Sequence, residues 1–560
     1  MRTDHHHRFS DPCLYPISSL NPERSRRSKL STALDRTLDR VNVLGDDTNH
    51  GHTGCVNALS WARDGDLLLS GGDDTTVRIW AIDAADNSQE YPYVCRAVIQ
   101  TGHQANIFST QMLPYSSRIA TVAGDNQVRV FDIGEDALAS SNGRETSYSA
   151  RQSCIGVLQC HRDRVKRIVT EYSPDLFLSV GEDGSVRQHD LRTPHECSRG
   201  SCPPPLVKVN HELSTLALSP LTPYQFVVAG ESPYGYLFDR RHAGRFLREE
   251  WGMVPGPGEE DSVTTCVRRF GRPKKTPGTQ RTRSEHVTGA RVSTYNGHEI
   301  LLSYSGDAVY LYSTADDPEP EGSMSSTPSL LASNAKQSKV DAAEPPATDG
   351  MDVDDTLSTA TEMGSNLSTT EQGADDGHDT HTEEHNDGDG DDDDEGYLEF
   401  ADFSEGDEEN FQPHVPIVLP RRRFAGARNV ATIKDVNFLG PVDDFVASGS
   451  DDGNFFVWRK STGALHGIYE GDSSVVNMVE GHPHLPLVAV SGIDTTVKLF
   501  APCNGPSRFS KIANAERIIE INSRLSRTRT IRYNFAALLA EARVAMGAGG
   551  EAEIPECRSQ

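Results

Sequence analysis

The chain has 560 residues, of which 82 are acidic and 54 basic, giving a net charge of −28 at pH 7. Residues 316–409 hold 30 acidic and two basic residues and carry all of that charge, so the remainder is neutral and lacks the basic excess typical of nucleic-acid binding. No run of 18 apolar residues occurs and the N-terminus has no apolar signal core, so we expect no membrane association and an intracellular location in the nucleus, the cytoplasm or both.

Near the N-terminus, residues 28–40 (SKLSTALDRTLDR) start with a Ser cap and place apolar residues at helical spacing, which predicts a short helix. The basic run 24–29, and a second run at 272–275, are candidate nuclear localisation signals. The strand-like residues 41–44 follow, and after them a repeat begins.

The repeat combines a small-residue strand, an Asp/Gly turn and an alternating strand that ends on an aromatic residue or His. SGGDDTTVRIW (70–80) and SGSDDGNFFVW (448–458) are clear copies. A unit of this kind, recurring about every 40 residues, indicates a WD-repeat β-propeller with one four-stranded blade per unit. Because propellers usually hold other molecules, we expect a binding protein rather than an enzyme.

Seven units align, although unit four has Ser232 in place of the turn Asp and unit five reaches its aromatic residue one position early. The long interval between units five and six becomes an ordinary one when 316–409 is removed, so we predict an acidic insertion between blades five and six. The strand-ending residues are Trp80, Phe131, His189, Phe238, Tyr312, Trp458 and Phe500.

The repeat residues are expected to build the ring. In unit one, His52, Ser70, Asp74 and Trp80 occupy the positions of the hydrogen-bonded quartet of WD repeats, which would supply donors to a buried carboxylate. We prefer this structural role to Ser-His-Asp catalysis, because the same residue types recur around the ring. The structural repeat residues are His52, Ser70, Asp74, Trp80, Asp125, Asp183, Asp452, Trp458 and Asp494.

The prediction is an all-β, seven-bladed WD-repeat propeller with a long disordered acidic insertion and short helical flanks. Blade seven lacks its outer strand, because the chain turns helical after Phe500, and residues 41–44 would supply it and close the ring. Helical apolar spacing recurs at 511–527 and 533–547. The segments are 1–44 (helix and ring-closing strand), 45–315 (blades one to five), 316–410 (acidic insertion), 411–502 (blades six and seven) and 503–560 (helical tail).

The acidic insertion has too few apolar residues to offset its chain entropy, so we expect disorder. It is either a solvated loop or a contact for basic partners such as histones. Ten cysteines are scattered along the chain, and the candidate metal ligands among them are Cys197 with Cys202, or Cys154 with Cys160 beside His161. Neither pair has a matching second pair, so we predict no metal, no cofactor and idle, reduced thiols.

Two successive units end in Asp-x-Arg: Asp190 with Arg192, and Asp239 with Arg241. The same strand end on each blade faces the same side of the ring, so the two guanidinium groups would lie one blade apart on one surface. They would either bind a partner's carboxylates or carbonyls, or form only local surface ion pairs.

On these residues the chain resembles the substrate receptors of cullin-4 ubiquitin ligases, the DDB1- and cullin-4-associated factors. That family docks on its adaptor, damaged-DNA-binding protein 1, through WD-x-Arg boxes on consecutive blades, and here His189 and Phe238 replace the Trp while both arginines are kept. Segments 54–80, 445–458 and 476–500 are similar to the branch of factors six and eight, and a large acidic insertion within the propeller is similar to factor six.

The resemblance implies a non-catalytic receptor that brings a target protein to the ligase, with Asp190, Arg192, Asp239 and Arg241 as adaptor-binding residues and the helix near the N-terminus as a further contact. The alternative is a WD-repeat scaffold or a histone- and chromatin-binding protein that uses the acidic insertion. An enzyme is not expected, since the chain has no Gly-rich phosphate loop and no GxSxG motif.

Overall fold

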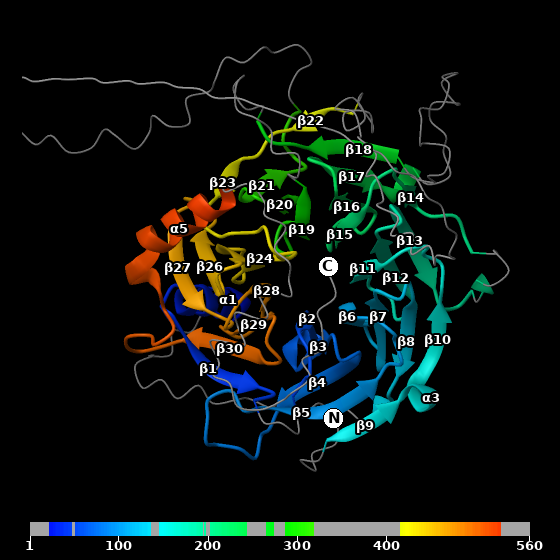
Figure 1. Cartoon of the computed structure of the whole chain (residues 1–560), viewed down its shortest axis with the longest axis horizontal. Helices are drawn as coiled ribbons and strands as arrows, with labels where there is room; N and C mark the ends of the chain where they lie inside the picture. The colour runs from blue at the N-terminus through cyan, green and yellow to red at the C-terminus, as the bar shows by residue number, and fades with distance from the viewer. Residues whose placement is uncertain are drawn as a thin grey trace, which may run out of the picture. The chain divides into compact units, whose positions relative to one another are not determined.

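Seven antiparallel sheets form a ring in the computed structural model, which confirms the predicted seven-bladed propeller (Figure 1). The structure describes residues 22–46, 51–135, 145–193, 195–197, 202–242, 265–273, 286–318 and 415–527. The first four blades are β2 (Val56–Ala62), β3 (Leu67–Gly72), β4 (Thr76–Ile82) and β5 (Tyr93–Gln100); β6 (Ile107–Met112), β7 (Arg118–Ala123), β8 (Val128–Asp132) and β10 (Cys154–Leu158); β11 (Val165–Thr170), β12 (Leu176–Gly181), β13 (Ser185–Asp190) and β14 (Val207–Lys208); and β15 (Leu213–Leu218), β16 (Gln225–Gly230), β17 (Gly235–Asp239) and β18 (Thr265–Phe270).

Blades five to seven follow the same pattern. They are β19 (Val287–Val292), β20 (Glu299–Tyr304), β21 (Val309–Ser313) and β23 (Arg422–Phe424); β24 (Val436–Leu439), β25 (Phe445–Gly449), β26 (Asn454–Arg459) and β27 (Leu465–Glu470); and β28 (Val476–Gly481), β29 (Val488–Gly492), β30 (Val497–Pro502) and β1 (Leu38–Leu44). Two extra strands add to blade edges in parallel, β9 (Thr146–Ser149) to β5 and β22 (Ile417–Val418) to β18.

The core is divided into seven clusters, each lying between two neighbouring blades. Trp80 and Leu68 of blade one, for example, pack with Met478 and Val497 of blade seven. Every sheet is therefore buried on both faces, which explains why so many strands are apolar along their whole length. No helix within the described ranges is long and apolar enough to cross a bilayer.

Blade seven is completed by the N-terminal strand. β1 runs antiparallel to β30, from Leu38 opposite Pro502 to Leu44 opposite Val497. The helix before it, α1 (Pro22–Leu34), starts and ends six residues earlier than the predicted 28–40. The prediction was wrong there because Leu38, which is 3 % exposed, belongs to the strand and packs between blades six and seven.

The acidic insertion lies within blade five, not between blades five and six. Its flanks are β21 and β23, adjacent strands of that blade, while β22 joins blade four, so residues 415–424 belong to blades four and five. The sequence could not show this, because β23 has only three residues and neither an Asp/Gly turn nor a repeat signature. Residues 319–414 and the second expected tail helix, 533–547, lie outside the described residues.

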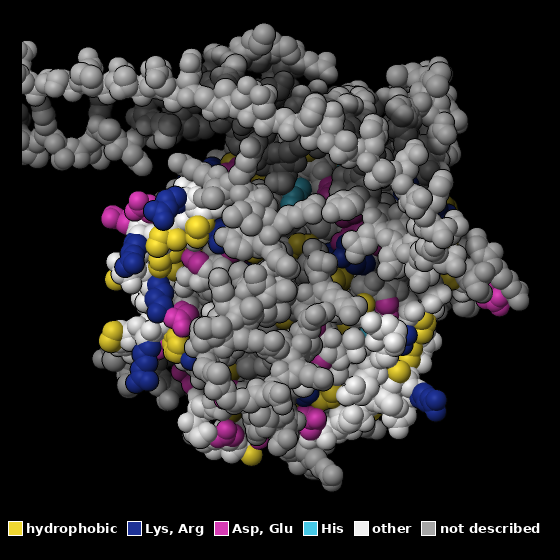
Figure 2. Space-filling view, viewed as in Figure 1, with side chains coloured by type: hydrophobic (Ala, Val, Ile, Leu, Met, Phe, Trp, Pro, Cys, Tyr) yellow, Lys and Arg dark blue, Asp and Glu magenta, His cyan; other side chains and the backbone are white. Residues whose placement is uncertain are grey.

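The tail helix expected at 511–527 is α5 (Ala515–Arg527), preceded by the short helix η4 (Ile512–Asn514). Ile518 and Ile519 pack on the cluster between blades five and six, whereas Ile521 is 41 % exposed. Hydrophobic side chains at the rim over α5 are flanked by basic and acidic ones (Figure 2). Elsewhere, the expectation of reduced thiols fails for Cys55, which is disulfide-bonded, while the other seven described cysteines are free.

The loop between β28 and β29 joins the first and last blades. The ring of His482 packs edge-on to that of Trp61, with 4.6 Å between the ring centres. The Nε2 atom of His482 lies 3.1 Å from the carbonyl oxygen of Gly65. The backbone N–H groups of His484 and Leu485 both donate to its Nδ1, at 3.0 and 2.9 Å. Nδ1 must therefore stay unprotonated, and burial lowers the pKa of His482 to about 4, despite the opposing effect of the Gly65 carbonyl.

The pKa of His482 predicts a loss of stability in mild acid. Because the folded pKa is below the ordinary 6.5, this residue's contribution is complete above pH 6.5 and declines as the pH falls towards 4. Between pH 7 and pH 5 it should reduce the free energy of unfolding by about 1 to 2 kcal/mol. His482→Asn keeps an acceptor for the two amides but does not titrate, so denaturant titrations should show a smaller difference between pH 7 and pH 5 than in wild type. The exposed His484→Asn serves as the control, and equal pH dependence in wild type and His482→Asn would contradict this account.

Candidate functional site

The connections between strands place the predicted docking residues on one side of the ring. In an antiparallel blade, the connection from the first to the second strand and that from the third to the fourth lie at the same edge. Arg192 and Arg241 follow β13 and β17, the third strands of blades three and four. We call the side of the ring that carries these connections the arginine face.

The two Asp-x-Arg ends have the same local structure. Arg192 donates from Nε and Nη2 to the two carboxylate oxygens of Asp190, at 2.9 and 2.8 Å, and its backbone N–H donates to the same carboxylate at 3.0 Å. Arg241 makes the same three contacts with Asp239, at 3.0, 2.6 and 3.0 Å. Yet the arginine side chains remain 61 % and 59 % exposed, so each is held in place but open to a partner.

Both carboxylates of the Asp-x-Arg ends have lowered pKa values, as expected of aspartates paired with arginine. Hydrogen bonds from Arg192 hold the pKa of Asp190 below its ordinary value. Burial raises the pKa of Asp239, but the hydrogen bonds from Arg241 outweigh it and the net pKa is lowered. Arg241 also lies over the ring of Tyr224, 3.9 Å from its centre, which further restricts its orientation.

Blade two has the same turn as the two Asp-x-Arg ends, but it has no arginine. Asp132 ends β8 and accepts the backbone N–H of Gly134 at 3.1 Å, which is the same turn. Glycine occupies the arginine position there, with a positive φ of 73°. The corresponding positions of the other blades do not read Asp-x-Arg, so the motif occurs on blades three and four alone.

An ion pair next to Arg241 fixes blade three against blade four. Arg240 donates from Nη1 and Nη2 to the two carboxylate oxygens of Glu171, at 2.8 and 2.9 Å. Both side chains are mostly buried, and the pair connects the two blades, so the spacing of Arg192 and Arg241 is set by the fold. A cavity of about 370 Å³ lies beside Arg241 and the ion pair, and its lining also includes Tyr224 and Leu206.

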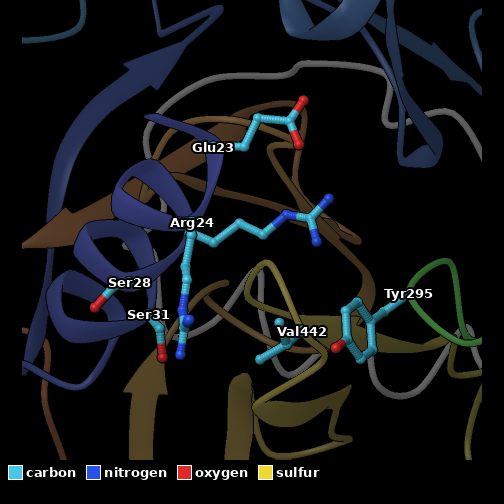
Figure 3. Close-up of a pocket in the computed structure, with 7 residues that line it drawn as sticks. Glu23, Arg24, Ser28, Ser31, Tyr295 and Val442 are labelled. Atoms are coloured by element: carbon cyan, nitrogen blue, oxygen red, sulfur yellow. The ribbon is translucent and has the colours of Figure 1, made fainter. Parts of the chain in front are cut away.

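The helix α1 contributes to the same face. A cavity of about 440 Å³ separates it from two loops, and Arg24 extends from the helix above Val442 and towards Tyr295 (Figure 3). Tyr295 and Val442 lie in the first-to-second strand connections of blades five and six, so they belong to the arginine face. α1 and the Asp-x-Arg ends therefore occupy one face of the ring.

The repeat residues of blade one form the quartet. His52 Nδ1 lies 3.0 Å from Asp74 Oδ2, His52 Nε2 lies 2.7 Å from Ser70 Oγ, and Trp80 donates to Ser70 at 2.9 Å. Burial raises the pKa of Asp74, but hydrogen bonds from His52 and from backbone amides dominate and lower it to about 2. All four side chains are inside the blade, where no substrate reaches them.

Blades two and three contain related networks. The repeat pattern predicts their aspartates and marks His189 as a strand end, but it does not assign Thr121, Ser179, His103 or His161 to them. In blade two, His103 joins Asp125 to Thr121. In blade three, His161 joins Asp183 to Ser179, and His189 replaces the tryptophan because its Nε2 also reaches Ser179, at 2.7 Å. Burial lowers the pKa of His189 well below its ordinary value.

The three remaining predicted residues make other contacts. Trp458 donates to the carbonyl oxygen of Ala425 at 3.1 Å, and Asp452 accepts from Asn522 of α5 at 2.9 Å. Asp494 pairs with Lys498. Blade six thus uses these positions to hold α5 and the segment that follows β23, whereas the Asp of blade seven pairs within its own hairpin.

Comparison with known proteins supports the assignment of this chain as a WD-repeat protein. The family described as WD domain, G-beta repeat matches residues 46–81. The chain is 36 % identical to WD repeat protein iqw1 of Schizosaccharomyces pombe over 50 % of its length, and 31 % identical to DDB1- and CUL4-associated factor 6 of Homo sapiens over 48 %. It spans only 34 % and 28 % of those two proteins. Protein ALTERED SEED GERMINATION 2 of Arabidopsis thaliana is 25 % identical, with 90 % of this chain and 93 % of that protein aligned.

The blade-three network predicts a stability cost for one hydroxyl group. Ser179→Ala removes the partner of both His161 and His189, leaving two buried polar nitrogens unsatisfied, so the free energy of unfolding should fall by about 2 to 4 kcal/mol. Ser88→Ala, in an exposed loop of blade one, is the control and should change it by less than about 0.5 kcal/mol. Urea denaturation measures both, and a Ser179→Ala protein as stable as the control would show that the network contributes little.

Proposed function

We propose that this protein is a non-catalytic substrate receptor that docks on the adaptor of a cullin-4-type ubiquitin ligase through its arginine face. The proposal depends on one observation: two exposed arginines, held in the same way by Asp190 and Asp239, lie on adjacent blades at a spacing set by the fold. Arginine forks fit carboxylates and carbonyls in two-point contacts, and preorganised side chains lose little entropy on binding.

Further features support the same partner. α1 borders the arginine face, where it would extend the contact. The similarity to DDB1- and CUL4-associated factor 6 supports an adaptor of the damaged-DNA-binding protein 1 type. The segments 54–80, 445–458 and 476–500 lead us to propose the branch of factors six and eight. Receptor function needs no chemistry, since holding a target beside a recruited conjugating enzyme raises its local concentration. We place this activity in the nucleus or the cytoplasm.

Removing the two arginines should separate docking from folding. The double variant Arg192→Ala, Arg241→Ala should fail to co-purify with the adaptor but should still fold, because both arginine side chains are at the surface. Its melting temperature should fall only slightly, because Arg241 is a partner of the buried Asp239, which keeps the backbone N–H of Arg241 as a donor. Arg192→Lys with Arg241→Lys keeps the charge but not the two-point geometry, so its retention of adaptor should be intermediate. The control is Arg162→Ala, an exposed arginine in the loop before β11, at the opposite edge of blade three. Full co-purification of the folded double alanine variant would refute docking through this face.

A deletion distinguishes the proposal from a scaffold that binds histones. Replacing 323–404 with a short Gly/Ser linker removes most of the acidic residues of the insertion and leaves every described residue in place. Under our proposal the deletion protein still binds the adaptor, measured by co-purification. If wild type never retains the adaptor but binds histones in a manner that the deletion abolishes, the scaffold alternative is correct.

A further inference from the structure

Three cysteines and a histidine from neighbouring blades converge at the junction of blades two and three. Cys160 follows β10, the outer strand of blade two, whereas His195, Cys197 and Cys202 lie in the connection between β13 and β14 of blade three. Their ligand atoms, three Sγ and His195 Nε2, all lie within 4.8 Å of one another. The first ligand is 35 residues from the second in sequence, so the fold brings the group together.

Three of the distances within the group are close to the edges of a zinc tetrahedron. With Zn–S bonds of about 2.3 Å and Zn–N bonds of about 2.0 Å, tetrahedral geometry places two sulfurs about 3.8 Å apart and a sulfur and a nitrogen about 3.5 Å apart. Cys160 Sγ lies 3.6 Å from Cys197 Sγ and 3.1 Å from His195 Nε2. Cys197 Sγ lies 3.4 Å from the same nitrogen.

The surroundings suit a structural metal. Cys160 is 6 % exposed and the other three side chains are half-buried. The backbone N–H of Gln159 lies 3.3 Å from Cys197 Sγ, the kind of second contact that orients a thiolate ligand. Three thiolates and one imidazole fill all four positions of a tetrahedral ion, which is typical of structural rather than catalytic zinc, and soft sulfur ligands disfavour magnesium and calcium.

We propose that Cys160, His195, Cys197 and Cys202 bind one structural Zn²⁺ ion that fastens the outer strand of blade two to the outer loop of blade three. A disulfide is the competing arrangement. It would bring Cys160 and Cys197 from 3.6 Å to about 2.05 Å and would leave Cys202 and His195 without a role.

The proposed group differs from both pairs that the sequence suggests. Cys154 begins β10 and Cys160 lies two residues beyond its end, so the extended chain between them spans up to about 20 Å. His161 points into blade three, towards Asp183 and Ser179. The ligands therefore comprise one cysteine of one pair, both cysteines of the other, and His195, which the sequence analysis did not consider.

The ion would also anchor a docking residue, a consequence that rests on the proposed function. Arg192 precedes His195 by three residues in the same connection. Without the ion, this connection would be held to blade two by fewer contacts, and Arg192 would be less well placed on the arginine face. Zinc content is measured independently of adaptor binding, so a failure of either idea can be recognised separately.

The test is the metal content of the purified full-length chain. His5–His7 are first changed to alanine, so that this run does not chelate metal. Plasma mass spectrometry should find one zinc per chain, and Cys197→Ser should lower this at least about fivefold. The control Cys154→Ser removes a free thiol at the start of β10, outside the proposed site, and should retain the zinc. Substitution with Co²⁺ should give sulfur-to-cobalt charge-transfer bands in wild type and in the control.

A ligand exchange keeps the test decisive if Cys197→Ser does not fold. His195→Cys creates four sulfur ligands and should retain one zinc per chain, with stronger charge-transfer absorption after Co²⁺ substitution. The proposal is overturned if wild type refolded with excess zinc holds much less than one ion per chain. It is equally overturned if folded Cys197→Ser keeps its zinc, or if peptide mapping of protein alkylated without reductant finds Cys160 and Cys197 in a disulfide.

Discussion

Closure of the ring is the constraint on which the rest of this structure depends. Each blade buries both faces against its neighbours, so one missing contact would expose two apolar surfaces. The pairing of β1 with β30 joins the first and last strands of the ring, and the loop containing His482 adds a second junction between blades seven and one. Because the closed ring holds every blade in place, the loops at the blade ends have fixed positions. The spacing of Arg192 and Arg241 depends on this.

Sequence patterns located the elements that carry strong local signals. The Asp/Gly turns and strand-ending aromatic residues identified all seven blades, because these residues are needed wherever a blade forms a tight turn and a buried strand end. The quartet of blade one was visible for the same reason. Serine and threonine partners such as Ser179 and Thr121 were not, since a buried hydroxyl has no sequence signature apart from its distance to a histidine.

Other features depend on spatial neighbours that a single chain does not reveal. The fourth strand of blade five is β23, whose three residues pair with β21 across the acidic insertion, and no periodicity marks so short a segment. The start of β1 was assigned to a helix because its apolar spacing fits either structure, and packing decided in favour of the strand. The cysteine–histidine cluster joins loops of two blades at irregular spacing, so spacing rules developed for local motifs did not find it.

The glycine turn of blade two has a consequence for how the arginine face changes in evolution. Gly134 has a left-handed backbone, with a φ of 73°. Arg192 and Arg241, which occupy the same position on blades three and four, do not have a positive φ. A single codon change to arginine there would introduce a side chain into a strained conformation, so the turn would have to be rebuilt before a third arginine joined the pair. Backbone geometry thus places a mutational barrier beside the pair and favours variation in the residues around it over growth in the number of arginines.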